Sequence, residues 1–298
     1  MSSKATREFR DRVVNQKCVW AAGAYDALSA RFIEAAGFDA LLTSGFGVSA
    51  SHLGLPDAEL YTMSENLAVV RNVTNVVNFP VVADIDTAYG NAINAMRTVR
   101  EFEAAGVSAV IMEDQVSPKR CPICVGGVEV IPLDEAVGKI RAAVAARTNP
   151  NMLIIARTDV VTEAEAIERG KAYVAAGADI IQPISKCFNS IEGLRALREA
   201  VGVPLSLQVL GWLEKKLSPA EIESVAGMAT FPLVPLMSVA TALQENLAQL
   251  AKDKSSRNLP RPVMAHDPFI EFIGFKEIEA QQMEYLPNPL AAKKAAAA

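Results

Sequence analysis

The chain has 298 residues, of which 51% are hydrophobic and 21% charged. This balance is typical of a folded domain with a full-sized core and excludes a disordered or fibrous protein. The net charge of -5 comes without a basic stripe, so we expect a small-molecule substrate and no nucleic-acid partner. A polar N-terminus and the lack of a long uncharged stretch predict a cytoplasmic protein with no membrane association.

An internal repeat predicts how the elements alternate. Gly37, Gly106 and Gly177 each follow a short run rich in alanine and precede a short apolar run. This pattern is typical of a helix end, a left-handed glycine and a strand. Each interval between the glycines has room for two strand–helix units of roughly 30 residues. The chain is therefore expected to repeat one strand–helix unit.

Eight apolar runs predict strands, in chain order, at residues 19–22, 40–44, 81–86, 109–113, 153–157, 179–184, 204–208 and 230–235. The runs are continuous rather than alternating, as is expected of parallel strands buried on both faces. Helical periodicity lies between and after them, at residues 91–105, 133–146, 162–175 and 238–251. The predicted fold is an α/β (β/α)8 TIM barrel rather than an open doubly wound sheet, since no Gly-x-Gly-x-x-Gly motif follows the first strand.

The end of the chain is expected to lie outside the barrel. We predict a single (β/α)8 barrel domain over residues 1–298, with residues 254–298 as a helical C-terminal extension. An amphipathic stretch at residues 268–285 contains three phenylalanines, which need a surface to cover. The chain's own barrel and a neighbouring subunit are both open as that surface.

Charged residues follow three of the predicted strands. Asp84 and Asp86 lie one residue apart at the end of the third strand, and alternation along a strand would place both on one face. Glu113 ends the fourth predicted strand and Arg157 the fifth. Because the carboxyl ends of barrel strands meet at one face, these side chains are expected to form an active site with oxygen ligands for a divalent cation. The alternative is that each charge only caps a loop.

A series of motifs adds a family resemblance. In chain order they are Ala24-Tyr25-Asp26-Ala27-Leu28, Thr43-Ser44-Gly45, Gly54-Leu55-Pro56-Asp57, Asp84-Ile85-Asp86-Thr87-Ala88-Tyr89-Gly90-Asn91, Glu113-Asp114-Gln115, Pro118-Lys119-Arg120-Cys121 and Ala156-Arg157-Thr158-Asp159. As a set they resemble the isocitrate lyase/phosphoenolpyruvate mutase superfamily, and within it the methylisocitrate lyase and dimethylmalate lyase branch. The resemblance implies a barrel that exchanges its eighth helix between subunits, a homotetramer, magnesium as cofactor, and a 2-hydroxy or 2-oxo acid as substrate.

The resemblance also implies roles for individual residues. Those implied to act in catalysis are Cys121, Arg157, Tyr25, Asp57 and Glu113. Those implied to bind a substrate carboxylate are Ser44, Gly45 and Phe46, through their amides, together with Arg157. Those implied to bind magnesium are Asp84, Asp86 and Glu113. From the residues alone, the segment at Gly45 is also compatible with a plain strand-to-helix turn, and Tyr25 with a packed aromatic.

The segment at Cys121 resembles the start of the mobile loop that supplies a cysteine general acid or base in the lyase branch. The pattern then departs, because Pro122-Ile123-Cys124 stands where Gly-His is usual, and a substrate-binding His is missing. We expect Cys121 to donate the proton, with Cys124 as the alternative, and residues 116–130 to form a lid. The Cys121–Cys124 spacing also fits zinc, but without a second pair the sequence favours thiols over a zinc site or disulfides.

The sixth and seventh strands leave the reaction open. Lyases of the superfamily usually place Glu near the end of strand six and Asn-x-Thr on strand seven. Here these stretches are Ile181-Gln182-Pro183-Ile184-Ser185-Lys186 and Leu205-Ser206-Leu207-Gln208-Val209-Leu210. The favoured function is magnesium-dependent C–C cleavage of a 2-hydroxy dicarboxylate of the substituted-malate or methylisocitrate type. The alternatives are decarboxylation or hydrolysis of an oxaloacetate-like 2-oxo acid, P–C bond chemistry on a phosphonopyruvate-like acid, and a non-catalytic acid-binding barrel.

Overall fold

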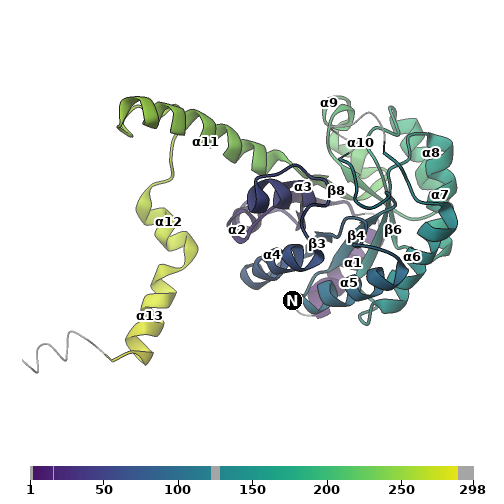
Figure 1. The fold of residues 1–298 in the computed structure, drawn as a ribbon, viewed down its shortest axis with the longest axis horizontal. Helices are drawn as coiled ribbons and strands as arrows, with labels where there is room; N and C mark the ends of the chain where they lie inside the picture. The colour runs from purple at the N-terminus through teal and green to yellow at the C-terminus, as the bar shows by residue number, and fades with distance from the viewer. Residues whose placement is uncertain (1–2, 16, 122–127, 288–298) are drawn as a thin grey trace, which may run out of the picture. The chain divides into compact units, whose positions relative to one another are not determined.

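The computed structural model describes residues 3–15, 17–121 and 128–287, and contains a closed barrel of eight parallel strands in sequential order (Figure 1). The strands are β1 (Val19–Ala24), β2 (Ala40–Thr43), β3 (Val81–Asp84), β4 (Ala109–Glu113), β5 (Leu153–Thr158), β6 (Ile180–Pro183), β7 (Leu205–Gln208) and β8 (Ala226–Phe231). Each pairs with the next, and β8 closes the ring on β1. The predicted (β/α)8 TIM barrel is confirmed.

Helices follow the strands and cover the outside of the barrel (Figure 1). They are α1 (Ser3–Val14), α2 (Ala27–Ala35), α3 (Gly45–Val48), the π-helix η1 (Ser49–Leu53), α4 (Met63–Val76), α5 (Ala92–Ala104), α6 (Leu133–Ala146), α7 (Glu163–Ala175), α8 (Ile191–Val201), α9 (Trp212–Lys216), α10 (Pro219–Glu223), α11 (Val234–Asp253), α12 (His266–Ile273) and α13 (Phe275–Tyr285). Polar residues begin several of them: the side chain of Asn91 accepts from the amides of Ile93 and Asn94 at the start of α5.

The three repeat glycines have the backbone that the sequence predicts. Gly37, Gly106 and Gly177 have φ of 84°, 90° and 103°, in the region that residues with a Cβ rarely adopt. Each lies in the short turn between a helix and the next strand, after α2, α5 and α7. The repeat therefore marks the points where the chain turns from the outer layer back into the barrel.

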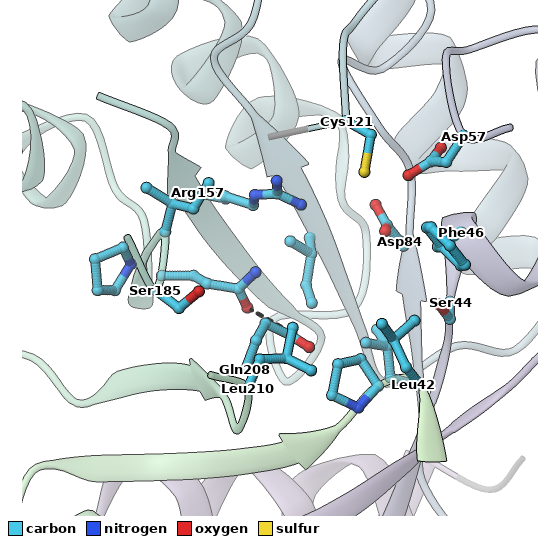
Figure 2. Close-up of a pocket in the computed structure, with 16 residues that line it drawn as sticks. Leu42, Ser44, Phe46, Asp57, Asp84, Cys121, Arg157, Ser185, Gln208 and Leu210 are labelled. Carbon is cyan, nitrogen blue, oxygen red and sulfur yellow. Dashed lines mark hydrogen bonds between the residues drawn. The ribbon is translucent and has the colours of Figure 1, made fainter. Parts of the chain in front are cut away.

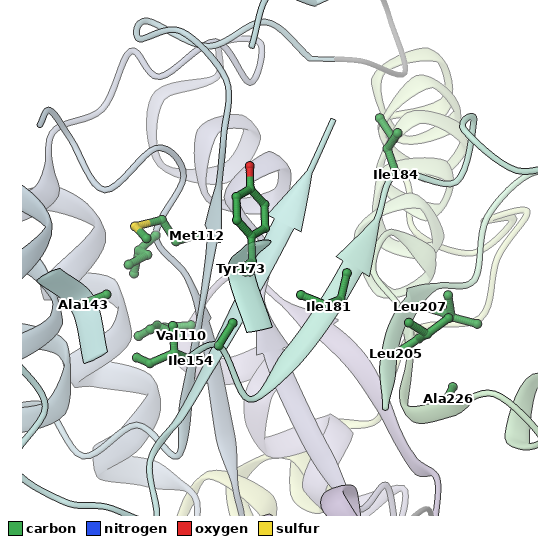
Figure 3. Packing of buried hydrophobic residues seen from close by; sticks show 14 of the residues in the cluster. Val110, Met112, Ala143, Ile154, Tyr173, Ile181, Ile184, Leu205, Leu207 and Ala226 are labelled. Carbon is green, nitrogen blue, oxygen red and sulfur yellow. The ribbon is translucent and has the colours of Figure 1, made fainter. Parts of the chain in front are cut away.

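The core has two parts because every strand is buried on both faces. One cluster fills the barrel interior and includes Leu42, Ile111 and Ile155. The other lies between strands and helices, where Val110 of β4 is packed with Ala143 of α6 (Figure 3). Alternate residues of a strand therefore enter different clusters, which explains why the apolar runs are continuous.

Two predicted strand boundaries are wrong in ways that matter. The eighth strand was expected at residues 230–235, but β8 is Ala226–Phe231 and α11 begins at Val234. Its first residues are small and weakly β-forming, so their pairing with β7 and β1, rather than local propensity, makes them a strand. The third strand was expected to run through Asp86, whereas β3 ends at Asp84.

The chain divides into two compact units, Met1–Ser238 and Val239–Ala298. In the second unit α12 contacts α13, and Arg261 binds Glu245 through two N–O contacts of 2.7 and 2.9 Å. No residue of α11, α12 or α13 is buried in the described chain. The expected single domain with an extension from residue 254 stays a prediction. No helix among the described residues is long and apolar enough to span a membrane, and the cytoplasmic location stays a prediction.

Candidate active site

The barrel brings the predicted charged residues together at the carboxyl ends of its strands. Asp84 ends β3, Glu113 ends β4, and Arg157 lies near the end of β5. The register of the parallel pairs aligns Glu113 with Arg157, so the two side chains are neighbours. Figure 2 shows Asp84 and Arg157 on facing sides of one pocket, with Cys121 above them.

The pocket is lined mainly by residues from the strand ends and the loops that follow them. Its lining comprises Leu42, Ser44, Phe46, Asp57, Asp84, Ile111, Cys121, Arg157, Gln182, Pro183, Ile184, Ser185, Gln208, Leu210, Pro232 and Leu233. Charged side chains occupy one side of it, whereas the residues from β6, β7 and β8 are apolar or neutral. The pocket therefore has one charged and one uncharged half.

Four carboxylates gather at the charged side. Asp57, Asp86 and Glu113 are buried, and Asp84 is partly exposed at the pocket surface. Burial raises the pKa of Asp84 to about 6, and the nearby Asp86 raises it further in the same direction. Burial also raises the pKa of Glu113 well above its usual value, although Arg157 opposes this shift. The acids destabilise one another unless cations are present among them.

Lys119 supplies one of those cations, and the sequence argument gave it no role. Its ammonium lies 2.5 Å from Asp86 Oδ1, 3.0 Å from Asp57 Oδ1 and 4.0 Å from Glu113 Oε1. Burial acts to lower the pKa of Lys119, but these carboxylates raise it well above the usual value. The residue therefore stays charged and links its own segment to the acidic cluster. Its position in the motif next to Cys121 was the signal available in the sequence.

Asp86 reaches the cluster through a turn rather than through the pleat of a strand. Asp86, Ala88 and Tyr89 have φ of 50°, 63° and 58°, which is uncommon for residues with a Cβ. Tyr61 donates to Asp86 Oδ2 at 2.5 Å, and the Asp86 amide donates to Asp84 Oδ1 at 3.1 Å. The expectation that strand alternation aligns the two aspartates is therefore wrong, although both belong to the acidic cluster.

Arg157 is fixed by two carboxylates. Its Nη1 lies 2.9 Å from Glu113 Oε2, and its Nη2 lies 2.9 Å from Asp159 Oδ1, which also accepts from Nε at 3.0 Å. Gln115 donates to the other oxygen of Asp159 at 2.8 Å. A guanidinium held in this way keeps a fixed orientation towards the pocket, which suits it to bind a substrate carboxylate.

The segment from Ser44 to Gly47 brings the backbone close to the acids. The Ser44 amide donates to Ala24 O at 2.9 Å, so it is used within the barrel. The Gly45 amide points to Asp84 Oδ2 at 3.4 Å, and a Cβ at Gly45 would lie 3.1 Å from the same oxygen. Phe46 and the Ser44 side chain line the pocket (Figure 2).

The remaining predicted residues differ in their access to the pocket. Asp57 and Cys121 line it, and Figure 2 shows the Cys121 sulfur directed towards the side that carries Asp57 and Asp84. Tyr25 is not part of the described lining, and a Cβ at Gly47 would lie 2.8 Å from Tyr25 Cβ. Tyr25 therefore packs beneath α3.

The thiols also differ in their surroundings. Cys18, Cys121 and Cys187 form no disulfide, and Cys124 lies outside the described residues. Burial raises the pKa of Cys18 and of Cys187 to about 12, so neither forms a thiolate near neutral pH. Cys121 is the one described thiol that lines the pocket.

The ends of the expected lid are joined to each other. Gln115 and Val130 form an antiparallel bridge, and the Val116 amide donates to Glu129 O at 2.9 Å. Residues 122–127 at its centre lie outside the described residues, so the lid stays a prediction.

The donor atoms fit a hard cation such as magnesium. All four acidic side chains offer oxygen, and neither oxygen of Glu113 accepts a hydrogen bond from a described residue. The described chain contains no preformed group of three metal-ligating side chains, and the Lys119 ammonium lies between Asp57 and Asp86. Asp84 is the acid that both lines the pocket and lies outside the contacts of Lys119 listed above.

A closed (β/α)8 barrel with acids, an arginine and a cysteine at the carboxyl ends of its strands defines a barrel enzyme with its chemistry at that face. The sequence pattern of the phosphoenolpyruvate phosphomutase family matches residues 9–253. The chain belongs to this family, the phosphoenolpyruvate mutase/isocitrate lyase superfamily of enzymes.

Curated relatives and solved structures resemble the chain over nearly its whole length. It is 38% identical to 2,3-dimethylmalate lyase of Eubacterium barkeri, over 93% of this chain and 97% of that protein. It is 35% identical to 2-methylisocitrate lyase of Shewanella oneidensis, over 94% of this chain and 96% of that protein. A phosphonopyruvate hydrolase solved with oxalate and Mg²⁺ matches with a TM-score of 0.84 and 31% identity, over 96% of this chain and 99% of that one.

Proposed function

We propose that the protein is a magnesium-dependent carbon–carbon lyase that cleaves a small 2-hydroxy dicarboxylate of the substituted-malate type. The observation that carries this proposal is the pocket in which Asp84, Arg157 and Cys121 face the same space (Figure 2). Cleavage of this kind uses a cation bound by oxygen, a clamp for the substrate carboxylate and a proton donor, and these side chains offer one of each. The lyase names of two full-length relatives support the same reaction type.

Magnesium would be held by Asp84, with Asp86 and Glu113 reaching it directly or through water. When bound, it would supply Lewis-acid polarisation of the substrate oxygens. The carboxylates outnumber the cations Lys119 and Arg157 in the described site, so a divalent cation would offset the remaining charge.

The protein's own side chains would orient the acid and move the proton. Arg157, fixed by Glu113 and Asp159, would bind the substrate carboxylate through its fork. A base removes the proton of the substrate hydroxyl, the C–C bond breaks, and Cys121 gives its proton to the carbon of the leaving fragment. Cys121 suits this step because it lines the pocket on the same side as Asp84.

The uncharged half of the pocket favours alkyl substituents over a third carboxylate. Ile184, Leu210 and Leu233 line it, and its polar groups are the neutral side chains of Ser185, Gln182 and Gln208. Gln208 donates to Gln182 Oε1 at 3.3 Å, so the two amides pair with each other. A carboxylate placed here would lose its hydration without gaining a cation. We therefore favour a dialkylmalate-like substrate over a tricarboxylate of the methylisocitrate type.

A second function remains in view because one observation favours it. The phosphonopyruvate hydrolase with oxalate and Mg²⁺ resembles this chain as closely in fold as the lyases do in sequence. Hydrolysis of a P–C bond, or loss of carbon dioxide from an oxaloacetate-like acid, would use the acidic cluster and Arg157 without a cysteine acid.

A substrate panel separates these functions. The purified protein would be incubated with magnesium and with 2,3-dimethylmalate, 2-methylisocitrate, oxaloacetate or phosphonopyruvate, and followed by proton and phosphorus NMR. We expect turnover of the dialkylmalate to a 2-oxo acid and a monocarboxylate, abolished by chelation. Phosphate release or decarboxylation alone would replace the lyase proposal by the second function, and no turnover of any of them would remove both.

We also propose that the protein assembles as a homotetramer in which α11 to α13 pack on a neighbouring subunit. Leu243 and Leu247 of α11 and Phe275 of α13 are 53%, 57% and 55% exposed, which is unfavourable for large apolar side chains in water.

A further inference from the structure

Glu59 lies between the acidic turn and the segment that carries Lys119 and Cys121. Its Oε1 accepts a hydrogen bond from Thr87 Oγ1 in the turn. Its Oε2 accepts from Ser117 Oγ at 2.7 Å and from the Lys119 amide at 2.9 Å. One carboxylate therefore bridges two segments that are far apart in the sequence.

The backbone of Glu59 is unusual for a residue that carries a side chain. Its φ is 55°, in the left-handed region that favours glycine. A non-glycine residue persists in such a conformation when its surroundings over-determine it, and such residues cluster at functional sites. The three hydrogen bonds of the carboxylate provide that determination here.

The turn that Glu59 contacts is itself strained. Asp86, Ala88 and Tyr89 all have positive φ, and Thr87 lies among them. Lys139 Nζ of α6 donates to the Thr87 carbonyl at 2.5 Å. Thr87 is therefore held through its carbonyl by α6 and through its hydroxyl by Glu59, and loss of either contact frees part of a turn that carries one of the site's acids.

The other end of the bridge controls a cation of the same site. Glu59 holds the main-chain amide of Lys119, while the Lys119 ammonium contacts Asp86 at 2.5 Å and Asp57 at 3.0 Å. The same carboxylate thus fixes the turn that presents Asp86 and the residue whose charge neutralises Asp86. Cys121 follows two residues later.

We propose that Glu59 is a positioning residue that couples the order of residues 117–121 to the order of the acidic turn at residues 86–89. Loosening one segment then loosens the other, so metal affinity and the placement of Cys121 depend on one carboxylate that touches neither metal nor substrate. The dependence on metal rests on the proposed function; the coupling of the two segments does not.

Replacement by glycine separates positioning from folding. Glu59→Gly removes the carboxylate but suits a φ of 55°, so we expect no loss of thermal stability. Lys254→Gly is the matched control, because Lys254 has a φ of 52° at the end of α11. Calorimetric titration should give magnesium affinity at least tenfold weaker in Glu59→Gly and unchanged in Lys254→Gly. Glu59→Gln keeps an acceptor oxygen and should recover part of the affinity and of kcat.

Hydrogen exchange in chelator tests the coupling without metal. In Glu59→Gly, the amides of residues 86–89 and of residues 117–121 should both exchange faster than in the wild type, and in Lys254→Gly neither segment should change. Faster exchange in one segment only, or in neither, would overturn the coupling. A wild type that binds no magnesium would instead overturn the proposed function, and the exchange result would still decide the role of Glu59.

Discussion

Asp84 differs from the other acids of the site in its surroundings. It is partly exposed in the pocket, whereas Asp57, Asp86 and Glu113 are buried, and its pKa is raised from a usual 3.8 to about 6 by burial and by Asp86. Because the folded-state pKa is raised, the native state binds more protons between these values, and this group alone makes the metal-free fold less stable as pH rises from about 4 to about 6. A bound cation would reverse that penalty.

Asp84→Asn should therefore separate stability from function. At pH 7.5 in chelator, we expect the variant to melt at or above the wild-type temperature, because the neutral amide removes a charge that burial disfavours. Added magnesium should raise the melting temperature of the wild type but not of the variant, and turnover should be lost. Asp267→Asn, at a fully exposed carboxylate, should behave as the wild type. Equal stabilisation of the variant by magnesium would contradict the assignment of Asp84.

Cys121 is the side chain on which the choice of reaction depends. We expect Cys121→Ser to lower kcat by about 100-fold or more, the upper part of the range for loss of a general acid, while magnesium affinity is unchanged. The measurement is steady-state turnover of the dialkylmalate together with calorimetric titration of magnesium. Cys187→Ser, which removes a thiol outside the pocket lining, is the control for the loss of any cysteine.

Cys124→Ser decides between the two thiols of the loop. A loss confined to Cys124→Ser would move the proton donor to that residue, which lies outside the described part of the structure. Full activity in both variants would remove the cysteine acid and favour decarboxylation or P–C hydrolysis.

At the scale of elements, α3 sets the distance between the backbone and the acidic cluster. A Cβ on Gly45 would lie 2.9 Å from the Tyr61 hydroxyl and 3.1 Å from both Asp84 Oδ2 and Asp86 Oδ1. The first residue of α3 is therefore glycine because the carboxylates occupy the space that a side chain would need.

Gly45→Ala should disrupt the site by displacing these side chains. We expect magnesium affinity and turnover to fall by at least tenfold, measured by calorimetry and by steady-state kinetics. Gly138→Ala in α6 is the matched control, because nothing lies within 4 Å of its Cβ, and alanine should stabilise the helix by about 1 kcal/mol. Wild-type affinity in Gly45→Ala would show that the acids can move without consequence.

At the scale of the whole molecule, the last three helices lack a core of their own. None of their residues is buried, and large apolar side chains along α11 and α13 are more than half exposed. Burying such a side chain contributes roughly 1.5 to 3 kcal/mol, so an assembly that covers several of them is strongly favoured.

Light scattering should give a mass about four times the 31.8 kDa of one chain. The double change Leu243→Glu and Leu247→Glu should shift the protein to smaller species at the same concentration, because charges would enter the proposed interface. Ile93→Glu, at a position on α5 that is 71% exposed, should leave the mass unchanged. A monomer at micromolar concentration in the wild type would rule out the proposed tetramer.

The barrel could be predicted from the sequence because burial leaves a local record. Parallel strands buried on both faces require continuous apolar runs, and the turns before them require glycine at positions such as Gly106 and Gly177. The same periodicity placed Asp84, Glu113 and Arg157 at strand ends, and barrel geometry brings strand ends to one face. The family resemblance added the candidate metal ligands and Cys121.

Contacts between distant segments left no such record, and only the tertiary structure decided them. Asp86 joins the acids through a strained turn rather than through a longer strand, and Lys119 places its charge among them. Glu59 then ties that turn to residues 117–119, across gaps that no local period encodes. Local sequence determines which backbone a segment prefers, whereas a hydrogen bond between segments exists only after the barrel has brought them together.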